Sequence, residues 1–201
     1  MSNGNVDPVN IPEAMDELDR EYWLLFSICV ANKSAEQTDK KMRLFMALSC
    51  KVSPFDKVRD LIAQGVLDKA LHIIKFGQYR RIEKAFRAVV DLDLKTLEAA
   101  QPDEAADMLM KIPGIGPKTA RMYLMYAFPA HADLWAPLDT HVLKFLRSQG
   151  YDAPKSTPPR GILYDTLERA FRREAEKRGM TMRELDTAVW TAYSEGRELS
   201  I

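Results

Sequence analysis

A Pro-Gly-Ile-Gly-Pro turn at residues 113–117 is the feature that most constrains the fold of this 201-residue chain. Gly114 and Gly116 lie two positions apart, and glycine tolerates positive φ and lets another backbone approach closely. Pro117 suits the first turn of a helix, where its missing N–H costs nothing. The sequence therefore predicts a helix, a tight hairpin and a second helix, over about 104–111, 112–116 and 117–128.

The remainder of the chain also predicts helices, because no segment shows a sustained period-two alternation of apolar and polar residues. Residues 34–37, Ser-Ala-Glu-Gln, form a capping box, and Ser53-Pro54 is a typical helix start. The expected helices cover about 12–31, 35–50, 54–65, 66–74, 78–90, 139–149, 160–178 and 182–194, with further starts near Thr96 and Asp103. The predicted fold class is all-α.

The start of the helix after the turn is predicted to bind an anion. Backbone N–H groups at a helix N-terminus point outward, and the helix dipole favours negative charge there. A DNA phosphate is a suitable anion, although such a contact carries no sequence information. Taken alone, the turn fits a plain junction between two packed helices equally well.

Two charged residues follow the turn at positions suited to chemistry. Lys118 lies one position inside the second helix among apolar neighbours, and a lysine desolvated there has a lowered pKa and a larger free-amine fraction. A free amine can attack C1′ of a deoxyribose and form a Schiff base. Asp139 precedes an apolar-periodic run, so we expect it to cap that helix and also to serve chemistry.

The segment 112–120, Ile-Pro-Gly-Ile-Gly-Pro-Lys-Thr-Ala, followed by Asp-Thr-His at 139–141, resembles the helix-hairpin-helix DNA glycosylase superfamily. That superfamily includes endonuclease III and the 8-oxoguanine glycosylases. Residues 30–38 resemble its early helix-loop-helix, and residues 76–82 resemble the Gly-x-Tyr loop that precedes a basic helix. The extra length between the lysine and the aspartate falls in residues 129–137 and should lengthen only a loop.

The resemblance implies two helical lobes with a DNA groove between them. Residues 34–128 would form a central lobe that ends in the helix-hairpin-helix, and residues 1–33 would join residues 129–201 in the other lobe. It also implies a bifunctional DNA glycosylase and AP lyase of base excision repair. Lys118 would attack C1′ of a flipped-out damaged nucleotide, and Asp139 would stabilise positive charge on the sugar.

Further residues are expected to contact DNA by their position in the resemblance. Asn32 matches a polar residue that fills the gap left by the flipped nucleotide, and Gln78 matches a wedge residue on the opposing loop; an amide can pair with an orphaned base edge. The other expected DNA contacts are Lys33, Tyr79, Arg80, Arg81, Gly114, Gly116, Thr119 and His141. A helix cap at Asn32, core packing of Tyr79, a solvated face at Arg80 and Arg81, and a structural role for His141 remain alternatives.

The resemblance also implies the class of base that is excised. Cluster-free, lysine-bearing members that resemble this chain act on oxidised purines, chiefly 8-oxoguanine, whereas oxidised pyrimidines or another modified base are the alternatives. Aromatic residues near both ends would line the base pocket or pack in the core: Tyr22, Trp23, Phe26, Trp190 and Tyr193. A non-catalytic helix-hairpin-helix DNA clamp and a protein-interaction module are the other functions that the sequence leaves open.

Cysteine and histidine counts argue against a metal centre. Cys29 and Cys50 lie in apolar helical patterns and are expected to be buried free thiols rather than a disulfide. Two cysteines cannot hold a four-cysteine iron–sulfur cluster, and the three histidines are widely spaced. We expect no metal site and no cofactor, with a structural cation at the hairpin as the one exception left open.

Charge distribution supports DNA as the partner although the net charge is zero. Residues 75–87 carry five Lys or Arg against one Glu, and residues 111–160 carry seven against three Asp, so each stretch is net +4. A polarised surface of this kind can bind phosphates on one face. Double-stranded DNA is the expected partner of a monomer. No membrane span or secretory signal is expected, so the predicted location is the cytoplasm beside the nucleoid, or the nucleus in a eukaryote.

Overall fold

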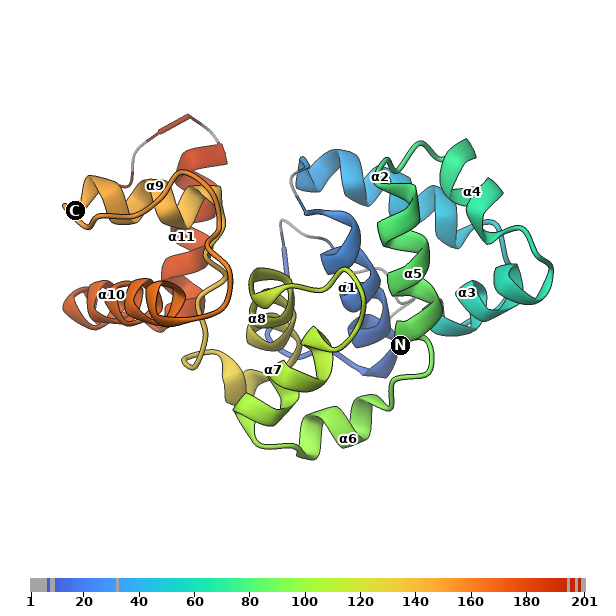
Figure 1. Cartoon of the computed structure of the whole chain (residues 1–201), viewed down its shortest axis with the longest axis horizontal. Coiled ribbons are helices and arrows are strands. Elements are labelled where there is room, and N and C mark those ends of the chain that lie inside the picture. Colours follow the sequence, from blue (N-terminus) through green and yellow to red (C-terminus); the bar gives the residue numbers. More distant parts are fainter. Residues whose placement is uncertain (1–6, 8–9, 32, 195, 198, 200–201) are drawn as a thin grey trace. The chain divides into compact units, whose positions relative to one another are not determined.

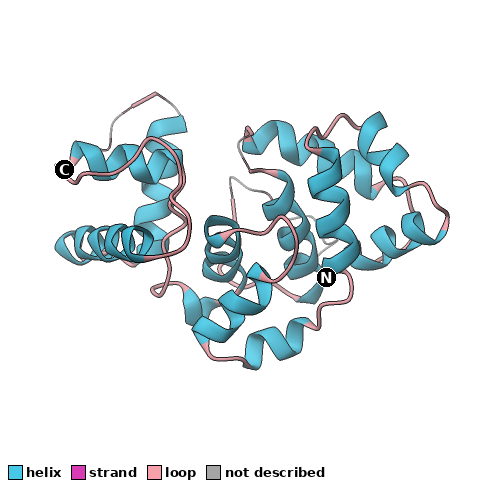
Figure 2. Cartoon of the chain, viewed as in Figure 1, coloured by secondary structure: helices cyan, strands magenta, loops and turns pink. Residues whose placement is uncertain are grey.

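A computed structural model describes residues 7, 10–31, 33–194, 196–197 and 199. These residues contain helices and no strand, which confirms the predicted all-α class (Figure 2). The first six helices are α1 (Glu17–Cys29), α2 (Ala35–Met46), α3 (Pro54–Ala63), α4 (Leu67–Ile73), α5 (Tyr79–Val89) and α6 (Leu94–Ala99). The others are α7 (Pro102–Met110), α8 (Pro117–Ala127), α9 (Thr140–Ser148), α10 (Ile162–Arg178) and α11 (Met182–Ser194), with a 3₁₀ turn η1 (Pro129–His131) (Figure 1).

The chain forms two compact units, Met1–Ile115 and Gly116–Ile201. The boundary falls inside the hairpin, so α7 belongs to the first unit and α8 to the second. This grouping differs from the predicted lobes at two helices: it places α1 with α2 to α7, and it places α8 with the C-terminal helices instead of at the end of the central lobe. The physical reason is that α1 is buried on nearly every face and packs against α2, α3 and α5.

The first unit is built around α1 and a cluster of aromatic rings. Phe45 of α2 meets Phe76 and Phe86 edge to face, with ring centroids 5.8 and 5.6 Å apart. The basic helix α5 buries an apolar stripe that includes Phe86 and leaves Arg80, Lys84 and Arg87 exposed, as its amphipathic pattern predicts. The core of this unit therefore holds the loop before α5 in place.

The second unit packs α9, α10 and α11 against one another and carries α8 as its first helix. Arg121 of α8 is buried, with its Nε 3.1 Å from a carboxylate oxygen of Glu168 and its guanidinium over the Tyr164 ring at 4.1 Å. Asp133 accepts a hydrogen bond from the backbone N–H of Met182 at 2.8 Å and so satisfies a donor at the start of α11. These contacts fix the helices that surround α8 within this unit.

Several element boundaries differ from the expected ones for local reasons. Helix α7 begins at Pro102, earlier than expected, because Gln101 and Glu104 form a capping box around it. Helix α2 ends at Met46 rather than near residue 50. As a consequence Cys50 lies beyond the helix and is exposed, so the prediction of a buried thiol is confirmed for Cys29 and wrong for Cys50.

No helix in the described part of the chain is both long and apolar enough to cross a lipid bilayer.

Candidate active centre

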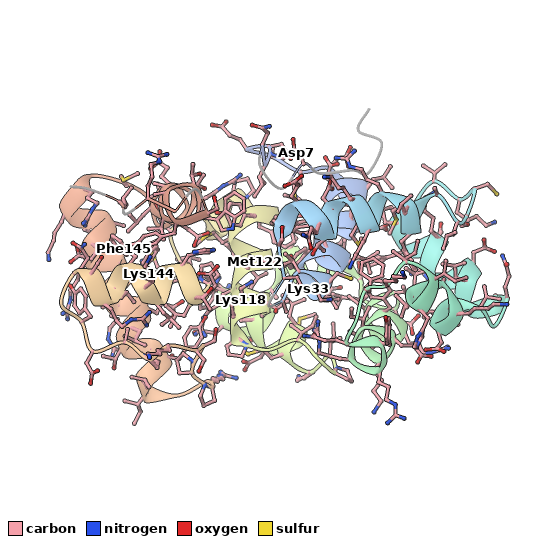
Figure 3. The ribbon with its side chains drawn as sticks, turned by 90° about the horizontal axis from the view of Figure 1, so that it is seen from above. Asp7, Lys33, Lys118, Met122, Lys144 and Phe145 are labelled. Carbon is pink, nitrogen blue, oxygen red and sulfur yellow. The ribbon has the colours of Figure 1, made fainter. Side chains whose placement is uncertain are left out.

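Lys118 is the second residue of α8 and lies partly buried in the second unit. Its Nζ lies 3.4 Å from the sulfur of Met122, one turn further along the same helix, and both side chains are labelled in Figure 3. Burial lowers the pKa of the Lys118 ammonium, against the opposing influence of the carboxylates of Asp139 and Asp186. The positive end of the α8 dipole acts in the same direction as burial. Lys118 is therefore an amine with an increased unprotonated fraction.

Asp139 caps α9, as expected from the sequence. Its Oδ1 accepts hydrogen bonds from the backbone N–H groups of His141 and Val142, both at 2.8 Å. Among the described residues, no hydrogen bond engages the second carboxylate oxygen, Oδ2. The cap thus uses one oxygen and leaves the other for an incoming charge, so capping and chemistry are compatible in one carboxylate.

Asp186 of α11 is a third charged group in this centre, and no pattern in the sequence pointed to it. The side chain is 7 % exposed and accepts a hydrogen bond from the Tyr126 hydroxyl at 2.7 Å. The same hydroxyl lies 3.1 Å from Oγ1 of Thr187. Burial and the neighbouring charge of Asp139 raise the pKa of Asp186 to about 7, while Tyr126 and Lys118 oppose the shift.

The one feature of the sequence that relates to the surroundings of Asp186 is the spacing of three side chains on α8. Lys118, Met122 and Tyr126 are spaced four residues apart and so share one helix face. That spacing indicates a common neighbour for the three side chains but does not say which distant carboxyl provides it. The second unit thus brings an amine, a capping carboxylate and a buried acid together, a set suited to nucleophilic attack with charge stabilisation.

The hairpin before α8 uses its two glycines differently. Gly114 has φ +89°, a conformation that favours glycine, and a Cβ there would lie 2.8 Å from Cγ of Arg81. Gly116 has φ −100°, and no described residue lies within 4 Å of the place of a Cβ, so that position is open. The first glycine is therefore required by the fold, whereas the second leaves room for another molecule beside the start of α8.

A strained loop precedes α5 in the first unit. Lys75 and Gln78 both have positive φ, +60° and +49°, although neither is glycine. Such strain persists only where surrounding structure holds it, and it often occurs at functional sites. An open cavity of about 760 Å³ lies at this loop and is lined by Asp68, His72, Gln78, Tyr79, Arg80 and Arg81.

Two of the predicted DNA contacts at this cavity, Arg80 and Arg81, differ in the number of hydrogen bonds that they make within the protein. Arg80 is exposed, and no hydrogen bond or ion pair to another described residue holds it. The guanidinium of Arg81 instead donates to Gln78 Oε1, to the Gly114 carbonyl and to the Ile28 carbonyl, at 2.6, 3.0 and 2.7 Å. Arg81 therefore joins parts of the first unit together, a role that the sequence did not predict.

Lys33 and Tyr79, two further predicted DNA contacts, differ in whether their side chains already have a partner within the described residues. The Nζ atom of Lys33 is buried and has no hydrogen-bond partner among the described residues, and burial lowers the pKa of its ammonium, helped by the charges of Arg81 and Lys41. Tyr79 stacks on His72 with ring centroids 3.7 Å apart. Lys33 thus has no anionic partner among the residues that the structure describes, whereas one face of Tyr79 is occupied by His72. Asn32 lies outside the described residues.

The aromatic residues predicted for a base pocket fall into separate units. In the first unit, Trp23 and Phe26 stack at 5.1 Å and the Tyr22 hydroxyl donates to Asp39 at 3.0 Å; all three side chains are buried. In the second, Tyr193 is buried and lies 4.7 Å beneath Nζ of Lys144, while Trp190 is partly exposed. A role for these rings in a base pocket stays a prediction.

Two more predicted DNA contacts belong to the second unit. The ring centroid of His141 lies 6.3 Å from that of Tyr193, and the Thr119 side chain is buried. In the described residues, no group of three or more His, Cys, Asp or Glu side chains is arranged to hold a metal ion.

Comparison with known proteins identifies the fold. No family model matches the chain. An 8-oxoguanine glycosylase/lyase of Methanocaldococcus jannaschii, in complex with a 15mer DNA containing 8-oxoguanine, is similar in structure with a TM-score of 0.67 and 23% sequence identity, over 90% of this chain and 84% of that chain. The 8-oxoguanine DNA glycosylase of Thermotoga maritima is similar with a TM-score of 0.63 and 22% identity, over 85% and 79% of the two chains.

A second structure of the Methanocaldococcus jannaschii 8-oxoguanine DNA glycosylase matches with a TM-score of 0.65 and 23% identity, over 90% of this chain and 81% of that chain. The predicted helical glycosylase fold is therefore confirmed. The similarity extends along most of the chain and is not confined to the hairpin and its flanking helices.

Proposed function

We propose that this protein is a bifunctional DNA glycosylase and AP lyase that removes a damaged base during base excision repair. The observation that carries the proposal is Lys118, a partly buried amine with a lowered pKa at the start of the hairpin helix, under the influence of the Asp139 carboxylate. The fold supports it, because its structural relatives are 8-oxoguanine DNA glycosylases. The partner is double-stranded DNA that contains a damaged base or an abasic site, bound by a monomer.

The reaction begins when the damaged nucleotide rotates out of the duplex, which costs a few kcal/mol and less for a damaged base. The lone pair of Lys118 Nζ forms a bond to C1′ while the C1′–N bond breaks and its electron pair leaves with the base. Asp139 stabilises the positive charge that develops on the sugar through Oδ2, the oxygen that the helix cap does not use.

The lyase step follows from the covalent intermediate. Opening of the sugar ring and loss of a proton from nitrogen convert the adduct into a Schiff base between Lys118 and C1′. Loss of a proton from C2′ then expels the 3′ phosphate by β-elimination, which nicks the strand 3′ to the lesion. The imine nitrogen serves as the electron sink, so this step requires an amine nucleophile.

DNA is held chiefly through its phosphates in this proposal. Phosphate oxygens would suit the N–H groups at the start of α8 and the open position beside Gly116. They would also suit the ammonium of Lys33, which has no hydrogen-bond partner in the described part of the chain. Arg80 is an exposed cation at the rim of the cavity beside the strained loop. These contacts are sequence-independent, which suits an enzyme that must find damage in any context.

The favoured substrate is an oxidised purine of the 8-oxoguanine type, because the structurally similar enzymes are 8-oxoguanine DNA glycosylases. An assay of strand cleavage without alkali tests the proposal on duplexes that contain 8-oxoguanine opposite cytosine or thymine glycol opposite adenine. Cleavage of the first duplex supports the proposal in full. Cleavage of the second duplex alone would indicate that the substrate is an oxidised pyrimidine. Binding without cleavage of either duplex, or of a duplex with an abasic site, would support a non-catalytic clamp.

A further inference from the structure

The amine of Lys118 makes a single hydrogen bond within the described part of the chain. Its Nζ donates to the sulfur of Met122 at 3.4 Å, and Figure 3 labels both side chains. The carboxylates of Asp139 and Asp186 act on the ammonium through their charge, but no hydrogen bond joins either of them to Nζ among the described residues. The thioether is therefore the one group in those residues that fixes the direction of the amine.

The geometry of α8 accounts for this contact. Lys118 and Met122 are one turn apart on the same face of the helix. Side chains in a helix lean toward its N-terminus, so the side chain of Met122 lies back over the turn that carries Lys118. Methionine has three rotatable bonds and a polarisable sulfur, which let it adapt to a long and flexible lysine. The contact is thus local to α8 and does not depend on a distant element.

A thioether differs from the other polar partners that a lysine could have at this position. The sulfur of methionine carries no hydrogen, so it can accept an N–H but cannot donate to the lone pair of Nζ. It is also a weak and uncharged acceptor, so it stabilises the ammonium much less than a carboxylate would. The sulfur therefore holds the amine without occupying its nucleophilic electron pair and without fixing it in the charged form.

The surroundings of the pair act on the same balance between ammonium and free amine. Lys118 and Met122 are both partly buried. Burial lowers the pKa of the Lys118 ammonium, whereas the carboxylates of Asp139 at the start of α9 and Asp186 on α11 oppose that shift. A strong acceptor in the place of the sulfur would act in the same direction as these carboxylates and reduce the unprotonated fraction. A weak acceptor is therefore the partner that suits a nucleophilic lysine here.

We propose that Met122 is a positioning residue of the reaction, whose thioether holds one N–H of Lys118 and so keeps the lone pair of Nζ oriented for attack. The inference rests on the proposed function, in which Lys118 is the nucleophile. Attack requires the reacting atoms to be aligned as well as close, and a lysine stem that is free to rotate spends less time in that alignment. Met122 acts only through the lysine and takes no part in making or breaking bonds.

Met122→Leu tests the proposal, because leucine is close to methionine in volume and has no acceptor. We expect single-turnover strand cleavage at an abasic site, measured with enzyme in excess, to slow about fivefold at every pH between about 6 and 9. The midpoint of thermal unfolding should move by no more than about 4 °C. Affinity for a duplex that carries a tetrahydrofuran abasic analogue should stay unchanged, since the lost contact is made within the protein.

Met122→Gln strengthens the acceptor instead of removing it. The amide oxygen of glutamine binds the ammonium more strongly than sulfur does and so raises the pKa of Lys118. Strand cleavage should then be slower than in the wild type at about pH 7 and should approach the wild-type rate at about pH 9, so the midpoint of the pH profile moves upward. A merely structural Met122 would leave that midpoint in place.

Met108→Leu is the matched control. Met108 is also a partly exposed methionine, but it lies on α7 in the first unit, and no described contact joins it to Lys118. The same substitution there should leave the cleavage rate and its pH profile unchanged. A wild-type rate in Met122→Leu, or equal slowing in both leucine variants, would overturn the proposal.

The wild type separates a failure of this inference from a failure of the proposed function. Wild-type cleavage of the abasic duplex, together with an unaffected Met122→Leu variant, contradicts the role of Met122 and leaves the proposed function intact. A wild type that binds the duplex but neither cleaves it nor is trapped by borohydride contradicts the proposed function and the inference with it.

Discussion

Asp139 uses one carboxylate oxygen for the fold and, in the proposed function, offers the other for chemistry. One oxygen caps α9 through two backbone N–H groups, and the other has no hydrogen-bond partner among the described residues. The sequence indicated both roles, because an aspartate before an apolar-periodic run is a typical cap and its distance from Lys118 resembles a glycosylase motif. Only the structure shows that a single oxygen of Asp139 accepts both capping hydrogen bonds.

Replacement of this carboxylate separates the two roles. Asp139→Asn keeps a good cap, so we expect the free energy of unfolding to change by well under about 1 kcal/mol. The rate of Schiff-base trapping should fall about 100-fold or more, because the neutral amide cannot stabilise a positive sugar. Single-turnover trapping and thermal unfolding measure the two effects.

Asp139→Ala is the matched control for the cap. It removes cap and charge together and should cost about 0.5–2 kcal/mol of stability as well as activity. An Asp139→Asn variant that traps at the wild-type rate would show that the carboxylate has no role in the chemistry.

Asp186 makes folding stability depend on pH. Its pKa is near 3.8 when unfolded and about 7 in the folded protein, so the folded state binds more protons between these values. Stability attributable to this group is therefore present at low pH and is lost as pH rises toward 7. Asp186→Asn can still accept the Tyr126 hydrogen bond but does not titrate.

The wild type should consequently lose more thermal stability than Asp186→Asn when the pH is raised from about 5 to about 8. Differential scanning calorimetry of the two proteins at both pH values measures this. An equal loss in both proteins would show that Asp186 is ionised throughout, contrary to its buried environment.

At the scale of the element, the sequence of the hairpin predicts the turn and the helix start but not the different backbone conformations of its two glycines. The Pro-Gly-Ile-Gly-Pro pattern predicted the turn and the start of α8, since the constraints involved are local to the backbone. The pattern does not indicate that Gly114 and Gly116 have different backbone conformations. Only Gly114 adopts positive φ, because its place is determined by Arg81, a residue distant in the sequence.

The two glycines should therefore respond differently to the same substitution. Gly114→Ala is expected to destabilise the protein by about 1–3 kcal/mol, because it combines an unfavourable φ with a contact to Arg81. Gly116→Ala should change stability by no more than about 0.5 kcal/mol, since its φ suits any residue and its surroundings are open.

Gly116→Ala should nevertheless weaken DNA binding, because its Cβ enters the space in which a phosphate backbone would lie. Urea unfolding and DNA titration of both variants separate stability from binding. Full DNA affinity in a stable Gly116→Ala variant would place the phosphate contact elsewhere.

At the scale of the whole molecule, the sequence predicted an all-helical fold, and the structure and its similarity to 8-oxoguanine DNA glycosylases confirm it. The division of the helices between the two units could not be predicted from the sequence. Periodicity shows that α1 has an apolar face, but it does not say that α2, α3 and α5 cover it. Asp186 was missed for the same reason, since partners across distant helices leave no local pattern.

A neutral protein that binds DNA should show a moderate salt dependence. Contacts to about three to five phosphates would give a slope of about −2.7 to −4.5 in a plot of log affinity against log salt concentration. Arg80→Ala should reduce the steepness by about one, because it removes one exposed cation. Lys95→Ala, on α6 and outside the predicted contacts, is the control; an equal effect of both substitutions would show that the contact surface is wrongly assigned.

Borohydride trapping tests most directly whether Lys118 is the nucleophile. Wild type, Lys118→Ala and Lys144→Ala are incubated with a labelled duplex that carries an abasic site and with one that carries 8-oxoguanine opposite cytosine. Lys144 is an exposed lysine of α9 in the same unit and serves as the matched control. A covalent protein–DNA band with wild type and Lys144→Ala, absent with Lys118→Ala, is the result we predict. A band of wild-type intensity with Lys118→Ala would show that another residue is the nucleophile, and no band with the wild type on the abasic duplex would show that the protein forms no Schiff base.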